Sequence, residues 1–324
     1  MIVSLEQKPS IDFAKYLINL EEPLQEIKPI YAIEGIPIFT RGNLSVISGK
    51  AKSRKSFLIS LLATRMMDDD TNCRILLFDT EQQRTLVVKT AKRIHRLLEW
   101  DEFKNNGRLK VFAMREASTR ERVDFIFSVI DKLKPDFVFV DGARDLAADF
   151  NNLSECSELV GKLMRFSSMY NCHICLVLHE NKSADTLRGH LGTELANKAE
   201  TVLQVVANEG ISTVSGRYTR NLPFNDFHFH VNDSGLPELC ELIEKPKNND
   251  KLKSLFGELL PVTCCVSYGD LKNKITERTG KSEPTSKRYI KEALEAGIIV
   301  KNNANLYYSF DTNNYHNNEN EFPF

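Results

Sequence analysis

Long apolar runs are missing from this 324-residue sequence. Because no stretch of about 18 consecutive apolar residues occurs, we predict no membrane-spanning helix and no membrane partner. The first ten residues, MIVSLEQKPS, lack a basic stretch followed by an apolar core, so we predict no signal peptide. The expected location is the cytoplasm.

Cysteine is sparse and has no regular spacing. The seven cysteines are odd in number and most lie in apolar runs, which is typical of buried thiols in a reducing compartment. Cys172 and Cys175 form a C-x-x-C pair, but no second pair supplies the four ligands of a zinc site. Residues three apart on a strand face opposite sides of a sheet. We therefore interpret this pair as buried strand residues rather than a metal or redox site.

The order of apolar segments predicts an α/β fold. Up to about residue 200, apolar strands alternate with helical stretches, which is the pattern of βαβ units around a mostly parallel sheet. The strands that we expect there cover residues 43–48, 74–79, 109–114, 137–141 and 173–178. Helix starts are expected at the capping box of Ser118 and Glu121 and at Ser154. After residue 200, short strands separated by turn residues predict an antiparallel extension of the sheet.

The segment GKAKSRKS, residues 49–56, almost matches a phosphate-binding loop but lacks one of its glycines. Gly49, Lys55 and Ser56 are in register with G-x-x-x-x-G-K-[ST], whereas Arg54 replaces the second glycine. A strand precedes the segment and a helix follows it, so backbone N–H groups can point at phosphates. The alternative is a basic turn between strand and helix, which requires neither these residue types nor this spacing.

We therefore predict an ATP site at this loop. Lys55 would reach the β and γ phosphates and Ser56 would hold Mg²⁺. Because glycine lets the backbone pass close to the phosphates, Arg54 is expected to alter nucleotide affinity or turnover. The predicted cofactor-binding residues are Gly49, Lys50, Ala51, Lys52, Ser53, Arg54, Lys55 and Ser56.

Two acidic residues at strand ends complete the predicted chemistry. Asp141 ends the apolar strand FVFVD, the place of a Walker B aspartate that serves Mg²⁺. No acid follows it directly, because Gly142 is next, so another residue must polarise the attacking water. Glu81 lies just past the strand that follows the P-loop helix. An aspartate after a strand is common, so Asp141 alone would be weak support for a metal site.

The ordered motifs together resemble a known family. The P-loop, DTE, VDGARDL and LVLHENK followed by LRGHLGTEL are similar to those of RecA-like ATPases, in particular the RepA-like branch of replicative helicases and related ATPases of plasmids and mobile elements. The resemblance covers residues 30–240. It implies that Glu81 is the catalytic base and that Asp141 serves Mg²⁺. It also implies that His179 senses the γ-phosphate and that Lys182 or Arg188 is a finger offered to a neighbouring subunit's nucleotide.

The resemblance thus implies a homo-oligomer, and the set of predicted catalytic residues is Lys55, Glu81, Asp141, His179, Lys182 and Arg188, with Ser56 and Asp141 on the metal. For His179, a strand-end histidine bonded to backbone is the alternative. For Lys182 and Arg188, the alternative is a pair of solvated loop charges.

The last part of the chain predicts a second, smaller domain. Helix, turn, a second helix from about Pro284 to Ala296 and a hairpin follow one another, which is the order of a winged helix and is similar to DNA-binding domains of that type. Residues 245–310 contain 12 Lys and Arg against 7 Asp and Glu, in a chain of net charge −1. The cations that would meet DNA phosphates on or beside the second helix are Lys281, Lys287, Arg288 and Lys291. A solvated helix face is the alternative on charge alone.

These inferences give an expected organisation and two candidate functions. The expected parts are an N-terminal segment (1–34), a RecA-like ATPase domain (35–243), a linker (244–250), a winged-helix-like domain (251–310) and a disordered tail (311–324). The first function is an ATP-hydrolysing, helicase-type motor or DNA-remodelling ATPase that serves replication or mobilisation of a plasmid or mobile element. The alternative is a nucleotide-regulated protein that binds DNA or recruits partners with little turnover.

Overall fold

The computed structural model describes residues 16–23, 28–180, 187, 189–241, 248–261, 265–302 and 304–309. The chain divides into two compact units, Met1–Glu241 and Leu242–Phe324. In the described residues, no helix combines the length and the apolar character that crossing a membrane requires.

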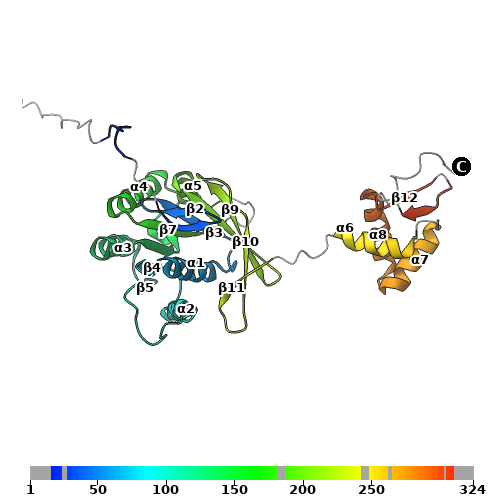
Figure 1. The fold of residues 1–324 in the computed structure, drawn as a ribbon, viewed down its shortest axis with the longest axis horizontal. Helices are drawn as coiled ribbons and strands as arrows, with labels where there is room; N and C mark the ends of the chain where they lie inside the picture. Colours follow the sequence, from blue (N-terminus) through cyan, green and yellow to red (C-terminus); the bar gives the residue numbers. More distant parts are fainter. Residues whose placement is uncertain are drawn as a thin grey trace, which may run out of the picture. The chain divides into compact units, whose positions relative to one another are not determined.

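The larger unit is built on a nine-stranded sheet with the order β11-β10-β9-β8-β3-β7-β6-β4-β5 (Figure 1). Its strands are β3 (Leu44–Gly49), β4 (Ile75–Asp79), β5 (Leu109–Ala113), β6 (Phe137–Asp141), β7 (His173–His179), β8 (Thr201–Asn208), β9 (Ile211–Thr219), β10 (Phe227–Val231) and β11 (Pro237–Cys240). The strands from β8 to β5 run parallel, and β9, β10 and β11 extend the sheet antiparallel. The predicted α/β fold with a mostly parallel sheet is confirmed.

Helices cover both faces of this sheet. They are α1 (Lys55–Asp69), α2 (Arg84–Leu97), α3 (Thr119–Leu133), α4 (Leu153–Tyr170), α5 (Gly189–Lys198) and the short 3₁₀ helix η2 (Ala143–Leu146). One apolar core packs α1 and α2 against the sheet, and the other packs α3, α4 and α5. Val46 and Ile47, neighbours on β3, belong to opposite cores, as the two-residue repeat of a strand requires. Cys172 and Cys175 are likewise buried in opposite cores.

The helix starts follow from local capping. Ser118 and Glu121 form the predicted capping box of α3. The expected start at Ser154 was wrong by two residues, because Asn152 caps α4 by accepting a hydrogen bond from the Glu155 N–H. Asparagine is as good a cap as serine, so the helix begins where the first acceptor stands.

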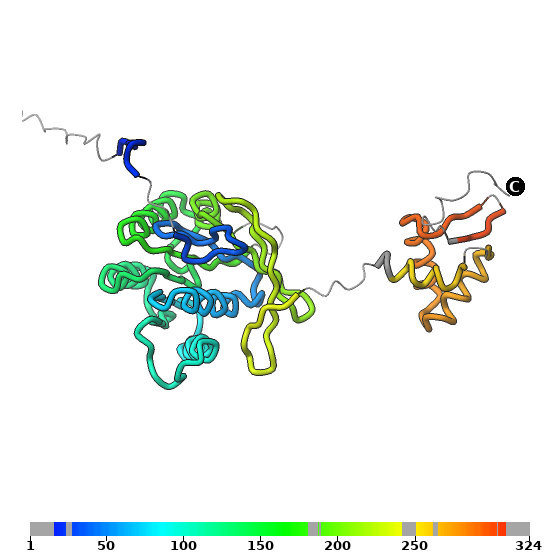
Figure 2. The backbone as a smooth tube through the Cα atoms, viewed as in Figure 1, coloured from blue at the N-terminus to red at the C-terminus, as the bar shows by residue number. Residues whose placement is uncertain are grey.

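A hairpin of β1 (Pro29–Ile33) and β2 (Ile36–Thr40) precedes the P-loop strand. Its turn at Glu34 and Gly35 has two left-handed residues, as hairpin turns of this length prefer. The expected start of the ATPase domain at residue 35 falls inside this turn. Figure 2 follows the same chain as a tube, with the yellow-green strands β9 to β11 at one side of the unit and α3 at the other.

The smaller unit has its own core. Helices α6 (Asn248–Leu259), α7 (Tyr268–Thr279) and α8 (Glu283–Glu295) are followed by the hairpin of β12 (Ile299–Lys301) and β13 (Tyr307–Ser309). Its core side chains include Phe256, Leu271, Ile275 and Ile290. The expected linker of residues 244–250 overlaps α6, which begins at Asn248.

Candidate active site

The P-loop connects β3 to α1 with an unusual backbone. At Gly49, a Cβ atom would lie 2.5 Å from the Val205 carbonyl oxygen and 2.6 Å from Ser53 Oγ, so only glycine fits. Arg54, immediately before α1, has φ 69° and ψ 28°, the left-handed conformation that glycine adopts without cost. This conformation explains why the usual loop has glycine here. The Arg54 guanidinium donates to the Gly210 carbonyl in the β8–β9 turn, so the side chain is anchored outside the loop.

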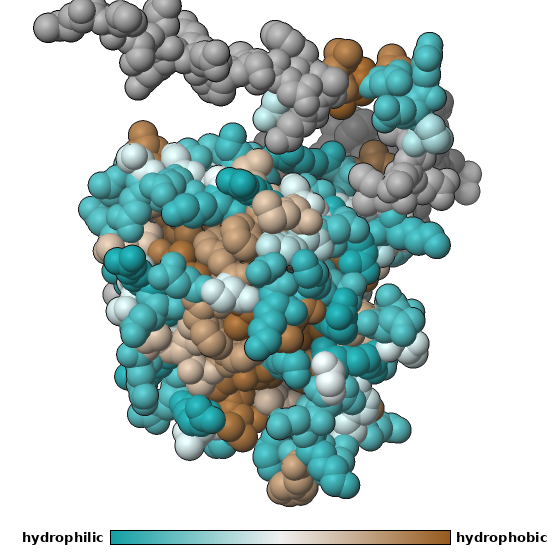
Figure 3. Space-filling model, turned by 90° about the vertical axis from the view of Figure 1, so that its left-hand side faces the viewer, coloured by the Kyte–Doolittle hydropathy of each residue, from teal (hydrophilic) through white to brown (hydrophobic). Residues whose placement is uncertain are grey.

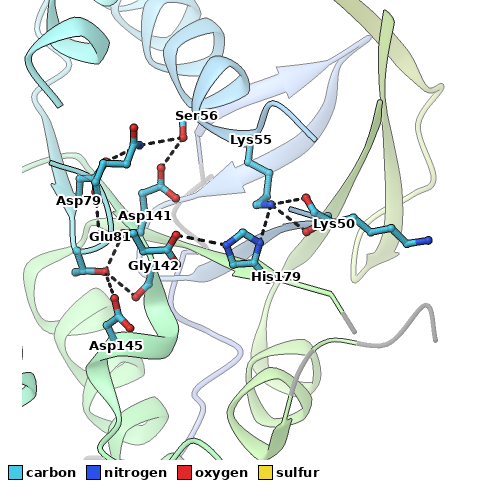
Figure 4. Close-up of polar contacts among 12 residues, drawn as sticks. Lys50, Lys55, Ser56, Asp79, Glu81, Asp141, Gly142, Asp145 and His179 are labelled. Atoms are coloured by element: carbon cyan, nitrogen blue, oxygen red, sulfur yellow. Dashed lines mark hydrogen bonds and ion pairs between the residues drawn. The ribbon is translucent and has the colours of Figure 1, made fainter. Parts of the chain in front are cut away.

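Lys55 is buried and points into the loop (Figure 4). Its Nζ donates to the Gly49 and Lys50 carbonyls, both at 2.9 Å, and lies 3.2 Å from His179 Nδ1. Burial lowers the pKa of Lys55, while the charges of Asp141 and Glu81 act in the opposite direction. No carboxylate in the described residues forms an ion pair with this ammonium. A buried cation held only by neutral acceptors suits an incoming anion.

His179 joins the lysine to the glutamate. An ammonium can only donate, so His179 Nδ1 accepts from Lys55 and Nε2 carries the proton. That Nε2–H faces Glu81 Oε2 at 3.4 Å (Figure 4). The hydrogen bond from His179 and the charges of His179 and Lys55 lower the pKa of Glu81 in spite of its partial burial. Glu81 is therefore ionised at neutral pH, as a proton acceptor must be.

Glycine 142 makes room for Glu81. Its φ is 99°, and a Cβ atom there would lie 2.1 Å from Thr80 Oγ1 and 2.7 Å from Glu81 Cγ. The absence of an acid after Asp141, noted in the sequence, is thus also a steric requirement of the neighbouring strand.

Two carboxylates meet beside the start of α1. Asp141 and Asp79 end β6 and β4 and are paired in register. Ser56 Oγ donates to Asp141 Oδ2 at 2.7 Å. Burial and the nearby Asp79 charge raise the pKa of Asp141 to about 6. Burial also raises the pKa of Asp79. Two buried carboxylates that repel each other beside a serine hydroxyl fit a divalent cation.

The loop and these carboxylates therefore fit Mg²⁺ and a nucleoside triphosphate. Ser53 Oγ is buried and has no hydrogen-bond partner among the described residues, so the loop keeps a polar group unused. When bound, Mg²⁺ would be held by Ser56 and Asp141, and it would neutralise phosphate charge.

The structure brings together Lys55, Ser56, Glu81, Asp141 and His179, all at the carboxyl end of the parallel strands. Lys182 and Arg188 lie outside the described residues, so their role as a finger stays a prediction.

Sequence reasoning missed two acids of this region. Asp79 Oδ1 accepts from the N–H groups of Glu81 and Gln82, which fixes the turn that carries Glu81. Its signal was its position at the end of an apolar strand, equivalent to that of Asp141. Glu180 follows His179 and is buried. Nothing in the sequence separated it from an ordinary loop glutamate.

Comparisons with known proteins agree with this geometry. Residues 22–185 match the protein-family model described as AAA domain, which covers half of the chain. The chain belongs to this AAA domain family. Its fold is similar to that of a solved helicase ATPase domain, with a TM-score of 0.50 and 13% sequence identity over 62% of this chain and 86% of that one. No curated protein matches the chain. The predicted RecA-like P-loop ATPase core is thus confirmed at the level of fold and family for this AAA domain protein.

Proposed function

We propose that this AAA domain protein hydrolyses ATP with Mg²⁺ and works as a helicase-type motor or DNA-remodelling ATPase. The observation that carries the proposal is the chain of contacts from Lys55 through His179 to Glu81, beside the Ser56–Asp141 pair. Glu81 would take the proton of the attacking water. Lys55 would stabilise charge on the phosphates. The proposed setting, replication or mobilisation of a plasmid or mobile element, rests on the resemblance to the RepA-like branch.

The test is ATP hydrolysis by the full-length chain with and without DNA. A motor that works on DNA should hydrolyse ATP only with Mg²⁺ and faster when DNA is added. The second candidate function, nucleotide-regulated binding with little turnover, predicts ATP binding without DNA-stimulated hydrolysis. Arg54 favours this second function, because a non-glycine residue holds a left-handed position in the loop.

We also propose a homo-oligomer in which Lys182 or Arg188 completes the neighbour's site. An apolar edge supports it: strand β5 ends the sheet, and exposed Val88, Phe103 and Phe125 lie near it. Figure 3 views the molecule from the side on which Figure 1 places α3 and β5, and apolar residues gather in the middle of that face. Patches of this kind are typical of protein interfaces.

Mixing separates a shared site from a self-sufficient one. The Arg188→Ala or Lys182→Ala protein has an intact P-loop, and the Lys55→Ala protein has an intact finger. If the finger acts across an interface, mixing the two inactive proteins should restore part of the ATPase activity. A fully active monomer would contradict the proposal.

For the smaller unit we propose a winged-helix-like domain that binds duplex DNA. Helix order and the hairpin support it, but the charges of α8 are more balanced than their number suggests. Each cation of the helix has a glutamate one turn away: Lys287 with Glu283 at 2.9 Å, Arg288 with Glu292 at 3.5 Å, and Lys291 with Glu295 at 3.8 Å. Lys281, before the helix, has no ion pair among the described residues.

These pairs sharpen the DNA experiment. The full-length chain is tested for duplex binding over a salt series, and then with Lys281→Ala and with Lys287→Ala plus Arg288→Ala. Removing one cation that binds a phosphate should lower the salt slope by about one. Because Lys281 has no competing acid, its change should have the larger effect per residue. If the full-length chain binds no duplex at low salt, the unit is redirected to protein contacts.

A further inference from the structure

Glu180 is a buried acid that the proposed chemistry does not use. It directly follows His179, and its side chain is only 2% exposed. Its Oε1 accepts from donors on three different strands. They are Ser48 Oγ on β3 at 3.1 Å, Gln204 Nε2 on β8 at 2.7 Å and Arg217 Nη1 on β9 at 3.3 Å. One carboxylate oxygen therefore ties the end of β7 to the P-loop strand and to the two strands beyond it.

The backbone of Glu180 makes the same connection. Its N–H donates to the Gly49 carbonyl at 3.3 Å. That carbonyl also accepts from Lys55 Nζ. Glu180 further pairs with Leu187 in an isolated antiparallel bridge. The residue thus lies where the P-loop, the strand that carries His179 and the return of the following segment meet.

We propose that Glu180 is a positioning residue that holds His179 between Lys55 and Glu81. The Glu180 carboxylate fixes the last residues of β7 against β3. Without that anchor, the His179 ring is free to leave the 3.2 Å and 3.4 Å contacts that join it to Lys55 and Glu81. This inference rests on the proposed ATPase function for its kinetic consequence but not for its geometric one.

The sheet offers a matched control at its opposite end. Glu200 is also a buried carboxylate and accepts from the Thr40 N–H, Thr40 Oγ1 and Asn221 Nδ2. It touches none of the proposed catalytic residues. Glu180→Gln and Glu200→Gln therefore make the same chemical change in equally buried networks, one beside the site and one away from it.

The kinetic test compares these two variants of the full-length chain at a temperature where both are folded. Glu180→Gln should lower kcat for ATP by about tenfold or more, because a small misplacement of a reacting group is costly. Its Kd for Mg-ATP should change by less than about twofold, because the P-loop itself is unaltered. Glu200→Gln should keep kcat within about twofold. Equal loss of kcat in both variants, or none in Glu180→Gln, overturns the proposal.

A second measurement works even if the chain hydrolyses no ATP. The ring carbon–proton signal of His179, assigned with His179→Asn, should shift in Glu180→Gln and stay in place in Glu200→Gln. If Glu180→Gln fails to fold, Gln204→Leu removes the shortest of the three bonds without stranding a charge and should shift the same signal. An unmoved His179 signal in the folded variants overturns the positioning role. Absent hydrolysis in the unmutated chain overturns only the proposed function.

Discussion

The two ends of the parallel sheet solve opposite problems with similar residues. At the amino end, His173 is fully buried, its Nδ1–H donates to the Thr40 carbonyl at 2.7 Å, and its Nε2 lies 2.8 Å from Ser45 Oγ. Glu200 beside it accepts three hydrogen bonds, two of them from Thr40. At the carboxyl end, Lys55 has only neutral acceptors within hydrogen-bond distance. The amino end is a finished network, whereas the carboxyl end keeps charges that a ligand would complete.

His173 illustrates how far the finished network goes. Its Nδ1 lies 4.0 Å from Glu200 Oε2, a distance at which a protonated ring would form an ion pair. Burial nevertheless lowers the pKa of His173 to about 4, and both ring nitrogens already have partners. The ring is therefore neutral and structural, while His179 on the same strand holds its proton between two functional side chains.

The largest expected effect comes from removing the buried cation of the carboxyl end. Lys55→Ala should abolish both ATP binding and hydrolysis, because no other described cation lies at the centre of the loop. Calorimetry with Mg-ATP and a steady-state ATPase assay measure the two losses. ATP binding of normal strength by the folded variant would mean that the loop is not the nucleotide site.

Glu81→Gln should separate binding from chemistry. The amide keeps the shape of the side chain but cannot accept a proton, so Mg-ATP should still bind while hydrolysis falls by about 100-fold or more. The same two assays apply, and Glu121→Gln, an exposed change at the start of α3, is a control. Hydrolysis at the unmutated rate would remove Glu81 from the catalytic role.

Acid should move the two ends of the sheet in opposite directions. Asp141 has a pKa raised from 3.8 to about 6, so its contribution to stability is fully present below pH 3.8 and is lost as pH rises through 6. His173 has a pKa lowered from 6.5 to about 4, so its contribution is present above pH 6.5 and is lost as pH falls through 4. Each difference corresponds to about 3 kcal/mol.

Variants at each end isolate these contributions. Denaturant unfolding is followed between pH 7.5 and 4.5 by the fluorescence of Trp100, the single tryptophan, which lies in the larger unit. The stability of the unmutated chain relative to Asp141→Asn should rise as pH falls. Its stability relative to His173→Gln should fall over the same range. Two differences that move in the same direction would show that the ends do not differ in this way.

The same comparison shows what the sequence could predict. Residues at strand ends were readable, because Gly49, Asp141 and His179 each close an apolar run and parallel strands bring such ends together. Contacts made by side chains far apart in sequence were not. Glu180 acquires its role only from Gln204 and Arg217, and neither residue carries a motif.

The C-terminal unit shows another limit of sequence reasoning. A count of cations there predicts a basic surface, but the helical spacing of Lys287, Arg288 and Lys291 places each beside a glutamate. Pairing at four-residue spacing is itself visible in a sequence once the helix register is fixed. Which of the paired cations DNA could claim depends on exposure and geometry, and these come only from the structure.

The smallest effect sharpens the comparison at the loop itself. Arg54→Gly and Arg54→Ala both remove the guanidinium that donates to the Gly210 carbonyl, so this hydrogen bond is absent from both variants. Only glycine relieves the left-handed backbone at φ 69°. Arg54→Gly should therefore be more stable than Arg54→Ala by about 1 kcal/mol. Denaturant unfolding measures this difference, and the ATPase assay should show higher turnover for Arg54→Gly than for the unmutated chain, because the backbone can then approach the phosphates more closely. Equal stability of the two variants would mean that the loop relaxes out of the left-handed conformation, and unchanged turnover would mean that Arg54 does not limit hydrolysis.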